Sequence, residues 1–147
     1  MKTRILFKKL RADAEPPVRA HDGDAGWDVR GVREDNPFPD MAMYGTGLAF
    51  AVPRGCWLDV RARSSVYRTG MVLCNGVGTV DSAYRGEVKA MFYRVQPQGT
   101  IPYASGERVA QLVPMPCRAD EVEFVEVDEL PPSWDGRGEG GFGSTGA

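Results

Sequence analysis

Short stretches in which apolar and polar residues alternate recur along this chain, and a period of two is typical of β-strands with one buried face. The alternation is clearest over 56–62, 88–93 and 109–113. Further strands are expected over 4–10, 46–52, 71–74 and 121–127. No segment keeps a helical period over three turns, and 64–69 is expected to form about one helical turn.

Glycine and proline separate these segments, for example at 53–55, 98–99 and 105–106. Many short strands with such breakers predict an all-β sandwich, jelly roll or barrel. The 147 residues are the size of one domain with its own core. The final stretch is expected to form no strand in its own sheet and to dock elsewhere. We therefore expect a β domain over 1–130 and a C-terminal arm over 131–147.

The composition excludes several classes of function. A net charge of −2 gives no broad basic surface for nucleic acid or an anionic membrane. Three widely spaced cysteines with apolar neighbours indicate buried, reduced thiols, and a single histidine rules out a multi-histidine metal site. Only three consecutive apolar residues occur near the N-terminus, so we expect neither a signal peptide nor a membrane span. These features favour a cytoplasmic protein.

The last dozen residues, GRGEGGFGSTGA, hold six of the eighteen glycines around one aromatic residue, Phe142. Consecutive glycine N–H groups can curl around an anion, and an arginine such as Arg137 offers a fork of donors to phosphate oxygens. A Gly-rich tail is more often a flexible linker. A spacer has no use for the arginine or the phenylalanine, so we interpret the tail as a mobile lid over a phosphorylated aromatic ligand.

Five segments carry the candidate chemistry: GDAGWDV at 23–29, ARSS at 62–65, NGVGTVDSAYRGE at 75–87, GERVAQLV at 106–113 and RGEGGFGSTG at 137–146. Each is weak alone, but five in this order and spacing are strong evidence. Together they resemble the five motifs of the homotrimeric dUTPase family, whose pattern TGL at 46–48 also fits. The resemblance spans nearly the whole chain.

The resemblance implies a jelly-roll-like β domain, the β-clip fold of dUTPases. It implies a symmetric homotrimer with active sites at subunit interfaces, where the tail of one subunit covers a site built by the other two. The implied reaction is hydrolysis of dUTP to dUMP and pyrophosphate by water attack on the α-phosphorus. It would limit uracil in DNA and supply dUMP for thymidylate synthesis, with Mg²⁺ as the cofactor.

Two residues match the family's hydrolytic positions. Asp81 stands where the third motif places the general base, and a carboxylate is ionised near neutrality without special tuning. By residue type alone, Asp81 would be a turn aspartate beside Ser82. Gln111 matches the position that helps to hold the attacking water, and without the resemblance it would be an outward-facing strand residue.

A second group matches the positions that bind the base and sugar. Tyr84 fits the residue that stacks under the deoxyribose and leaves no room for a 2′-hydroxyl, although a packed β-sheet tyrosine is the simpler interpretation. Asn75 matches the start of the hairpin whose main chain reads uracil, where turn conformation alone would also favour Asn. The remaining members are Gly78, Thr79, Val80 and Lys89.

A third group matches the phosphate and metal positions. The second motif, Arg63, Ser64 and Ser65, would hold phosphate oxygens, although these residues could equally form a solvated strand face. Asp28 matches a position that reaches the metal through coordinated water, and Mg²⁺ held mainly by substrate phosphates needs no protein cage. The tail would close with Phe142 over uracil and the following residues near the terminal phosphates: Arg137, Gly143, Ser144 and Thr145.

Some positions depart from the family pattern. Ser65 stands where glycine is usual, Ala83 where an acidic residue is usual, and Trp27 in place of Tyr or Leu. The segment 33–44 shows little of the usual strand pattern.

Two alternative functions are open. One is a dCTP deaminase-like enzyme, which shares RSS but would need a glutamate where Met91 stands. The other is a nucleotide-dependent regulatory protein on the same fold.

Overall fold

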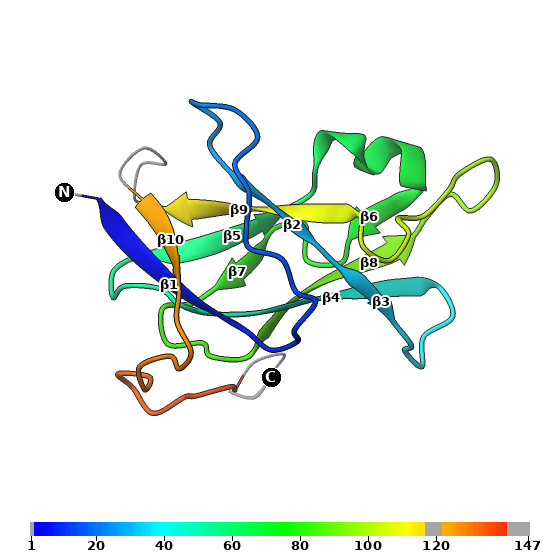
Figure 1. The fold of residues 1–147 in the computed structure, drawn as a ribbon. Helices are drawn as coiled ribbons and strands as arrows, with labels where there is room; N and C mark the ends of the chain where they lie inside the picture. The colour runs from blue at the N-terminus through cyan, green and yellow to red at the C-terminus, as the bar shows by residue number, and fades with distance from the viewer. Residues whose placement is uncertain (1, 117–121, 141–147) are drawn as a thin grey trace.

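The computed structural model of the chain describes residues 2–116 and 122–140. Within them the regular secondary structure is almost entirely β-strand (Figure 1). The exception is one short 3-10 helix, η1, over Ser64–Thr69. The strands are β1 (Thr3–Lys9), β2 (Trp27–Arg30), β3 (Val32–Glu34), β4 (Met41–Ala51), β5 (Trp57–Arg61), β6 (Met71–Leu73), β7 (Gly78–Val80), β8 (Glu87–Arg94), β9 (Arg108–Met115) and β10 (Val122–Glu126). The all-β prediction is therefore confirmed.

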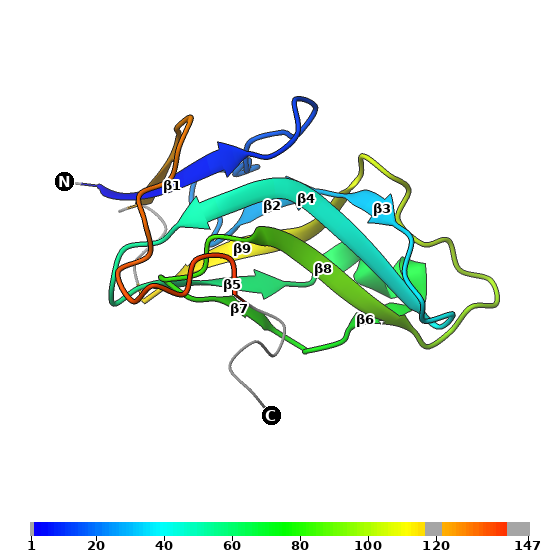
Figure 2. The ribbon, with the colours of Figure 1, turned by 90° about the horizontal axis from the view of Figure 1, so that it is seen from below.

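The strands form two sheets. The larger has the order β10-β1-β4-β8-β6, with β3 paired to β4, and the smaller has the order β2-β9-β5-β7. All pairs are antiparallel except β1 with β10, which run parallel. Figure 2 shows the long strands β4 and β8 lying across the strands of the smaller sheet. Strands from both sheets supply one continuous core, as alternating strand faces require.

Aromatic and aliphatic side chains from both sheets fill this core. Tyr44 packs edge-on against Phe92 and Tyr103, at ring-centroid distances of 5.8 and 6.3 Å. The buried Tyr44 hydroxyl donates to the Tyr103 main-chain carbonyl at 2.7 Å, so the phenol group is not left unpaired. The largest fully buried side chains are Tyr44, Phe50, Phe92, Ile5, Leu48, Leu58, Leu112, Val29 and Val109.

The predicted strands are all present, but several strands were missed. The segment 33–44 was expected to show little strand pattern, and it contains the end of β3 and the beginning of β4. Apolar side chains occupy both faces of β4, so its sequence does not alternate between apolar and polar residues. The strands β2 and β7 are only a few residues long, too short for a clear alternation. In β5, Asp59 is buried among apolar neighbours because Trp57 and Arg61 donate to its carboxylate.

After β10 the chain leaves the sheets. Residues 131–140 form turns and contain no strand. In Figure 2 this part of the chain, coloured orange to red, turns back toward the start of β8. The segment lies against residues 82–85 of its own chain. The first ten residues of the arm thus dock on their own chain, and the expectation that the tail covers a site built by two other subunits stays a prediction.

Candidate active site

The smaller sheet gathers one group of candidate residues, which we call the arginine cluster: Asp28, Arg63, Ser65, Arg108 and Gln111. Antiparallel pairing places Asp28 of β2 directly opposite Gln111 of β9. Arg63 lies just beyond β5, where an extended backbone leads into η1. Strand register thus brings together residues that are distant in the sequence.

Ion pairs hold the arginine cluster together. The Asp28 carboxylate accepts from Arg63 Nε and from Arg108 Nη1, both at 3.1 Å. The Asp28 and Arg63 side chains are only 16% and 23% exposed, so their attraction is screened less than that of a surface pair. Arg63 Nη1 also donates to Ser65 Oγ at 3.3 Å, whereas Ser64 is exposed. The guanidinium of Arg63 is therefore fixed before any ligand arrives.

Gln111 is held by a main-chain contact. Its Nε2 donates to the carbonyl of Ala62 at 3.0 Å, which orients the amide beside Arg63. Gly26 leaves the necessary space, since a Cβ there would lie 2.7 Å from Gln111 Oε1. The absence of a side chain at position 26 is thus required by the position of Gln111.

The hairpin that leads into β7 carries the next group. Within residues 2–116 and 122–140, β7 is the terminal strand of the smaller sheet and β5 is its one neighbour there. In that part of the chain, the other edge of the β7 main chain has no strand partner and leaves a row of donors and acceptors. Asn75 lies over Gly78, where an added Cβ would be 3.1 Å from Asn75 Nδ2. Thr79 is exposed on this strand and Val80 is buried.

Tyr84 and Lys89 lie after this hairpin. The Tyr84 hydroxyl donates to the carbonyl of Glu87 at 3.0 Å, and Gly86 makes room for its ring. Burial raises the pKa of Tyr84, while the charge of nearby Lys89 partly opposes that rise. Lys89 Nζ donates to Glu34 at 2.8 Å, and this hydrogen bond raises the pKa of Lys89. Lys89 thus stands near Tyr84 but is paired within the larger sheet.

Asp81 follows β7 directly and meets the arm. Arg137 Nη1 donates to Asp81 Oδ2 at 2.6 Å, and this hydrogen bond raises the pKa of Arg137. The Asp81 side chain is 53% exposed. It borders a cavity of about 390 Å³ that Trp57 and Trp134 also line. The Asp81 carboxylate is therefore accessible to a ligand and is paired with the guanidinium of Arg137.

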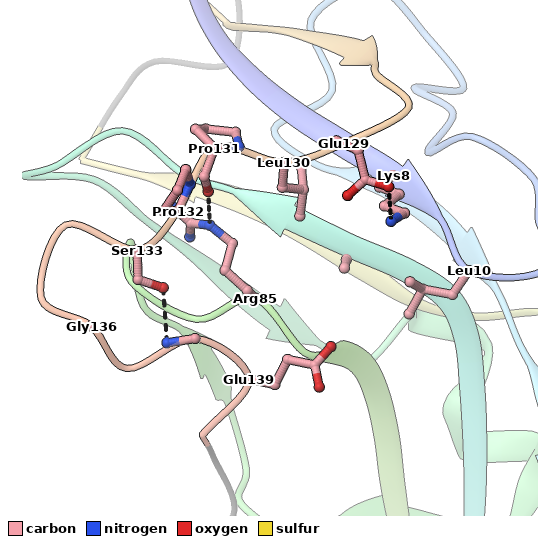
Figure 3. A pocket seen from close by; sticks show the side chains of 12 residues that line it. Lys8, Leu10, Arg85, Glu129, Leu130, Pro131, Pro132, Ser133, Gly136 and Glu139 are labelled. Atoms are coloured by element: carbon pink, nitrogen blue, oxygen red, sulfur yellow. Dashed lines mark hydrogen bonds and ion pairs between the residues drawn. The ribbon is translucent and has the colours of Figure 1, made fainter.

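Residues 81–85, which we call the Asp81 loop, contact the arm and so hold this arrangement. We call these contacts the arm clasp. Ser133 Oγ donates to the carbonyl of Ala83 at 2.6 Å and accepts from the N–H of Gly138 at 2.9 Å. Trp134 Nε1 donates to Ser82 Oγ at 3.1 Å. Arg85 donates from Nε to the carbonyl of Pro131 at 2.9 Å, as Figure 3 shows.

Arg85 also makes hydrogen bonds within its own loop. Its Nη1 donates to the carbonyls of Ser82 and Tyr84 at 2.7 and 3.0 Å. Its main-chain N–H donates to the carbonyl of Gly138 at 2.7 Å. Burial lowers the pKa of Arg85, which is consistent with a guanidinium enclosed between two chain segments. The arm clasp therefore holds the arm where Arg137 can pair with Asp81.

The arginine cluster and Asp81 lie at opposite ends of β5. Leu58 pairs with Val80, so extending that register by one residue places Asp81 opposite Trp57. Arg63 follows six residues after Trp57. At about 3.3 Å per residue the two backbones lie about 20 Å apart. We call these two separated groups of candidate residues the two half-sites. The predicted residues Phe142, Gly143, Ser144 and Thr145 lie outside the described residues.

The sequence reasoning missed several residues of these half-sites. Arg108 belongs to the fourth segment, GERVAQLV, and its charge was the available signal. Ser133 and Trp134 stand out only as a hydroxyl and an aromatic residue after two prolines. Tyr103, which contacts Ser65, carries no signal beyond its residue type.

Within residues 2–116 and 122–140, no three His, Cys, Asp or Glu side chains lie together as a metal site. The same part of the chain contains no helix of the length and hydropathy needed to cross a membrane. Asp28 is the carboxylate of the arginine cluster, and each of its oxygens accepts one arginine hydrogen bond. A carboxylate oxygen has a second lone pair, so Asp28 can still accept from a water.

Named proteins are similar to this chain over nearly its whole length. A deoxyuridine 5'-triphosphate nucleotidohydrolase of Streptomyces avermitilis is 39% identical over 144 residues, covering 97% of this chain and 80% of that protein. The enzyme of that name from Mycobacterium sp. strain JLS is 37% identical over 149 residues, covering 99% and 97%.

Solved structures show the same β-clip, jelly-roll fold. The dUTPase of Staphylococcus bacteriophage 80alpha with dUpNHpp has a TM-score of 0.64 and 25% identity, covering 97% of this chain and 98% of that one. The dUTPase of phage phi11 of S. aureus, described with a structural Mg(II) ion, has a TM-score of 0.64 at 22% identity over 86% of this chain. The model of the dUTPase family matches residues 12–146, and this chain belongs to the dUTPase family.

Proposed function

We propose that this protein hydrolyses dUTP to dUMP and pyrophosphate. One observation carries the proposal: an accessible carboxylate, Asp81, directly follows an edge strand and faces an arginine of the tail. Family membership supplies the substrate class. The product would feed thymidylate synthesis, and removal of dUTP would limit uracil in DNA.

In this mechanism Asp81 is the general base. It takes a proton from a water whose oxygen bonds to the α-phosphorus, while the bond from that phosphorus to the bridging oxygen breaks and pyrophosphate leaves. Gln111 helps to hold the water. Since Arg137 Nη1 is paired with Asp81 Oδ2, the mechanism requires the triphosphate to draw Arg137 away before Asp81 accepts the proton. Arg137 then stabilises the charge that develops on the leaving group.

The open edge of β7 supports the assignment of the base site. Main-chain groups from Gly78 to Val80 can pair with uracil as a neighbouring strand would, with Asn75 setting the turn. The half-buried Tyr84 supplies a rigid ring beside this edge, on which deoxyribose can stack. A 2′-hydroxyl would meet that ring.

The arginine cluster supports the assignment of the phosphate site. Arg63, Ser64 and Ser65 would bind phosphate oxygens, and Asp28 would accept from a water of the cation. Mg²⁺, when bound, would offset charge on the triphosphate, and its preference for water and phosphate ligands fits a chain without an acidic cage in its described part. Phe142, Gly143, Ser144 and Thr145 are proposed to close over the nucleotide.

We further propose a homotrimer with shared sites, in which Asp81 of one subunit faces the arginine cluster of the next. The separation of the two half-sites along β5 supports this arrangement. A closed ring of three identical subunits repeats one interface three times and so completes three sites.

A panel of four nucleotides tests the proposed reaction. Pyrophosphate release from dUTP should far exceed that from dTTP, dCTP and UTP. A pyrimidine with mismatched donors would leave buried polar groups unpaired, which discriminates strongly. Comparable rates on dCTP and dUTP, or ammonia release from dCTP, would overturn the assignment in favour of a deaminase-like enzyme.

A further inference from the structure

Tyr103 connects the core to the arginine cluster. Tyr103 is 7% exposed, and its ring packs against Tyr44 and Phe92 at centroid distances of 6.3 and 6.2 Å. The Tyr44 hydroxyl bonds its main-chain carbonyl, which fixes the backbone as well. From this rigid position the Tyr103 hydroxyl reaches Ser65 Oγ at 2.9 Å. The contact joins a buried phenol to a candidate phosphate ligand.

The direction of this hydrogen bond follows from the donors present. Among the described residues, Ser65 Oγ is the one partner of the Tyr103 hydroxyl. By geometry alone either hydroxyl could be the donor. If Ser65 donated, the phenolic proton of Tyr103, a residue that is 7% exposed, would have no acceptor among the described residues, which is costly. Tyr103 therefore donates to Ser65. Arg63, which has donors alone, also donates to Ser65 Oγ.

These two bonds determine what Ser65 can offer to a ligand. A hydroxyl has two acceptor lone pairs and one proton. Tyr103 and Arg63 occupy both lone pairs, so only the Ser65 proton remains for an incoming group. A hydroxyl that can only donate binds best to a hydrogen-bond acceptor. Every non-bridging oxygen of a phosphate is such an acceptor.

We propose that Tyr103 is a positioning residue, which acts through Ser65 to present the Ser65 hydroxyl as a donor to the triphosphate. The inference rests on the proposed function, because it takes Ser65 as a phosphate ligand. Without Tyr103 the Ser65 hydroxyl would be free to rotate and to offer a lone pair to the phosphate, which repels it.

A double-mutant cycle tests this role, with dUpNHpp as the probe and its dissociation constant as the measurement. Tyr103→Phe should weaken binding about fivefold, and Ser65→Ala about tenfold, as expected for hydrogen bonds to a charged group. The double variant should bind no worse than Ser65→Ala alone, because the phenol acts only through the serine. Equal losses from Tyr103→Phe in both backgrounds would overturn the proposal.

Thr46→Val is the control. It removes another buried side-chain hydroxyl, which donates to the main-chain carbonyl of Val88 at 2.7 Å. Both Tyr103→Phe and Thr46→Val should lower the melting temperature, but only Tyr103→Phe should weaken dUpNHpp binding by more than about twofold. An equal loss of affinity in Thr46→Val would reduce Tyr103 to a core residue. A wild-type protein that neither binds dUpNHpp nor hydrolyses dUTP would instead overturn the proposed function itself.

Discussion

The arginine cluster and the Asp81 loop are built in different ways. The cluster takes its residues from β2, from β9 and from the segment just beyond β5, and the mostly buried carboxylate of Asp28 forms salt bridges with both Arg63 and Arg108. The Asp81 loop lies beyond the terminal strand of its sheet, its Asp81 side chain is 53% exposed, and it depends on contacts with the arm. One half-site is fixed by the sheet, the other by a terminal segment.

Under the proposed function, this difference predicts that the cluster governs binding and the Asp81 loop governs turnover. A cluster that is fixed before substrate arrives can hold phosphates equally well in the ground state and the transition state, which affects KM. A loop whose carboxylate must exchange Arg137 for a water acts mainly in the transition state, which affects kcat. Variants in the two regions should therefore alter different kinetic constants.

The largest effect is expected for Asp81→Asn. The amide keeps the shape but cannot take a proton, so kcat should fall about a thousandfold, while dUpNHpp binds within about twofold of wild type. Asp135→Asn is the control, because Asp135 also lies near Arg137, at 4.0 Å. Near-normal turnover in Asp81→Asn would show that Asp81 is not the base.

Removal of 136–147 should have the next largest effect. The deletion takes away Arg137 and the proposed lid, so kcat should fall about a hundredfold while the fold and trimer persist. Light scattering and circular dichroism check the assembly and fold. Full activity in the truncated enzyme would mean that the tail is only a linker.

Asp28→Asn probes the fixed half-site. Loss of the charge shared by Arg63 and Arg108 should free both guanidinium groups and raise KM about tenfold, with little change in kcat. Asp24→Asn, on the exposed loop beside His21, is the matched control and should leave KM unchanged. A fall in kcat at constant KM would contradict the separation of binding from turnover.

The arm clasp should give the smallest effect. Ser133→Ala removes the bonds to Ala83 and Gly138, so kcat should fall about fivefold, as expected for loss of one or two hydrogen bonds. Ser133→Thr keeps the hydroxyl and should restore most of the rate. Steady-state kinetics on the two variants would decide the point, and equal rates for Ala and Thr would exclude a role for the hydroxyl.

The sequence predicts the parts of the molecule that depend on local pattern. Alternation predicts β5, β8 and β9, and the motifs indicate Asp81 and Arg63 as candidate site residues. Alternation could not show that Asp59 is buried, because its pairing with Trp57 and Arg61 depends on side-chain geometry. The docking of Ser133 on Ala83 joins positions 50 residues apart, which no local pattern encodes.

The central claim is that Asp81 and Arg63 of one active site belong to different subunits. Two variants can be co-expressed with different affinity tags, and mixed trimers purified by both tags. Asp81→Asn should turn over almost no dUTP, and Arg63→Ala should bind dUTP too weakly to hydrolyse it at a low substrate concentration. In a ring of three, every mixed trimer has one interface where an intact Asp81 faces an intact Arg63.

The measurement is the rate of dUTP hydrolysis by these mixed trimers. The shared-site arrangement predicts about one third of the wild-type rate, because one interface in three is restored. If each site instead lay within a single chain, no mixed trimer would contain a complete site. Activity no higher than that of the separate variants would therefore contradict the account.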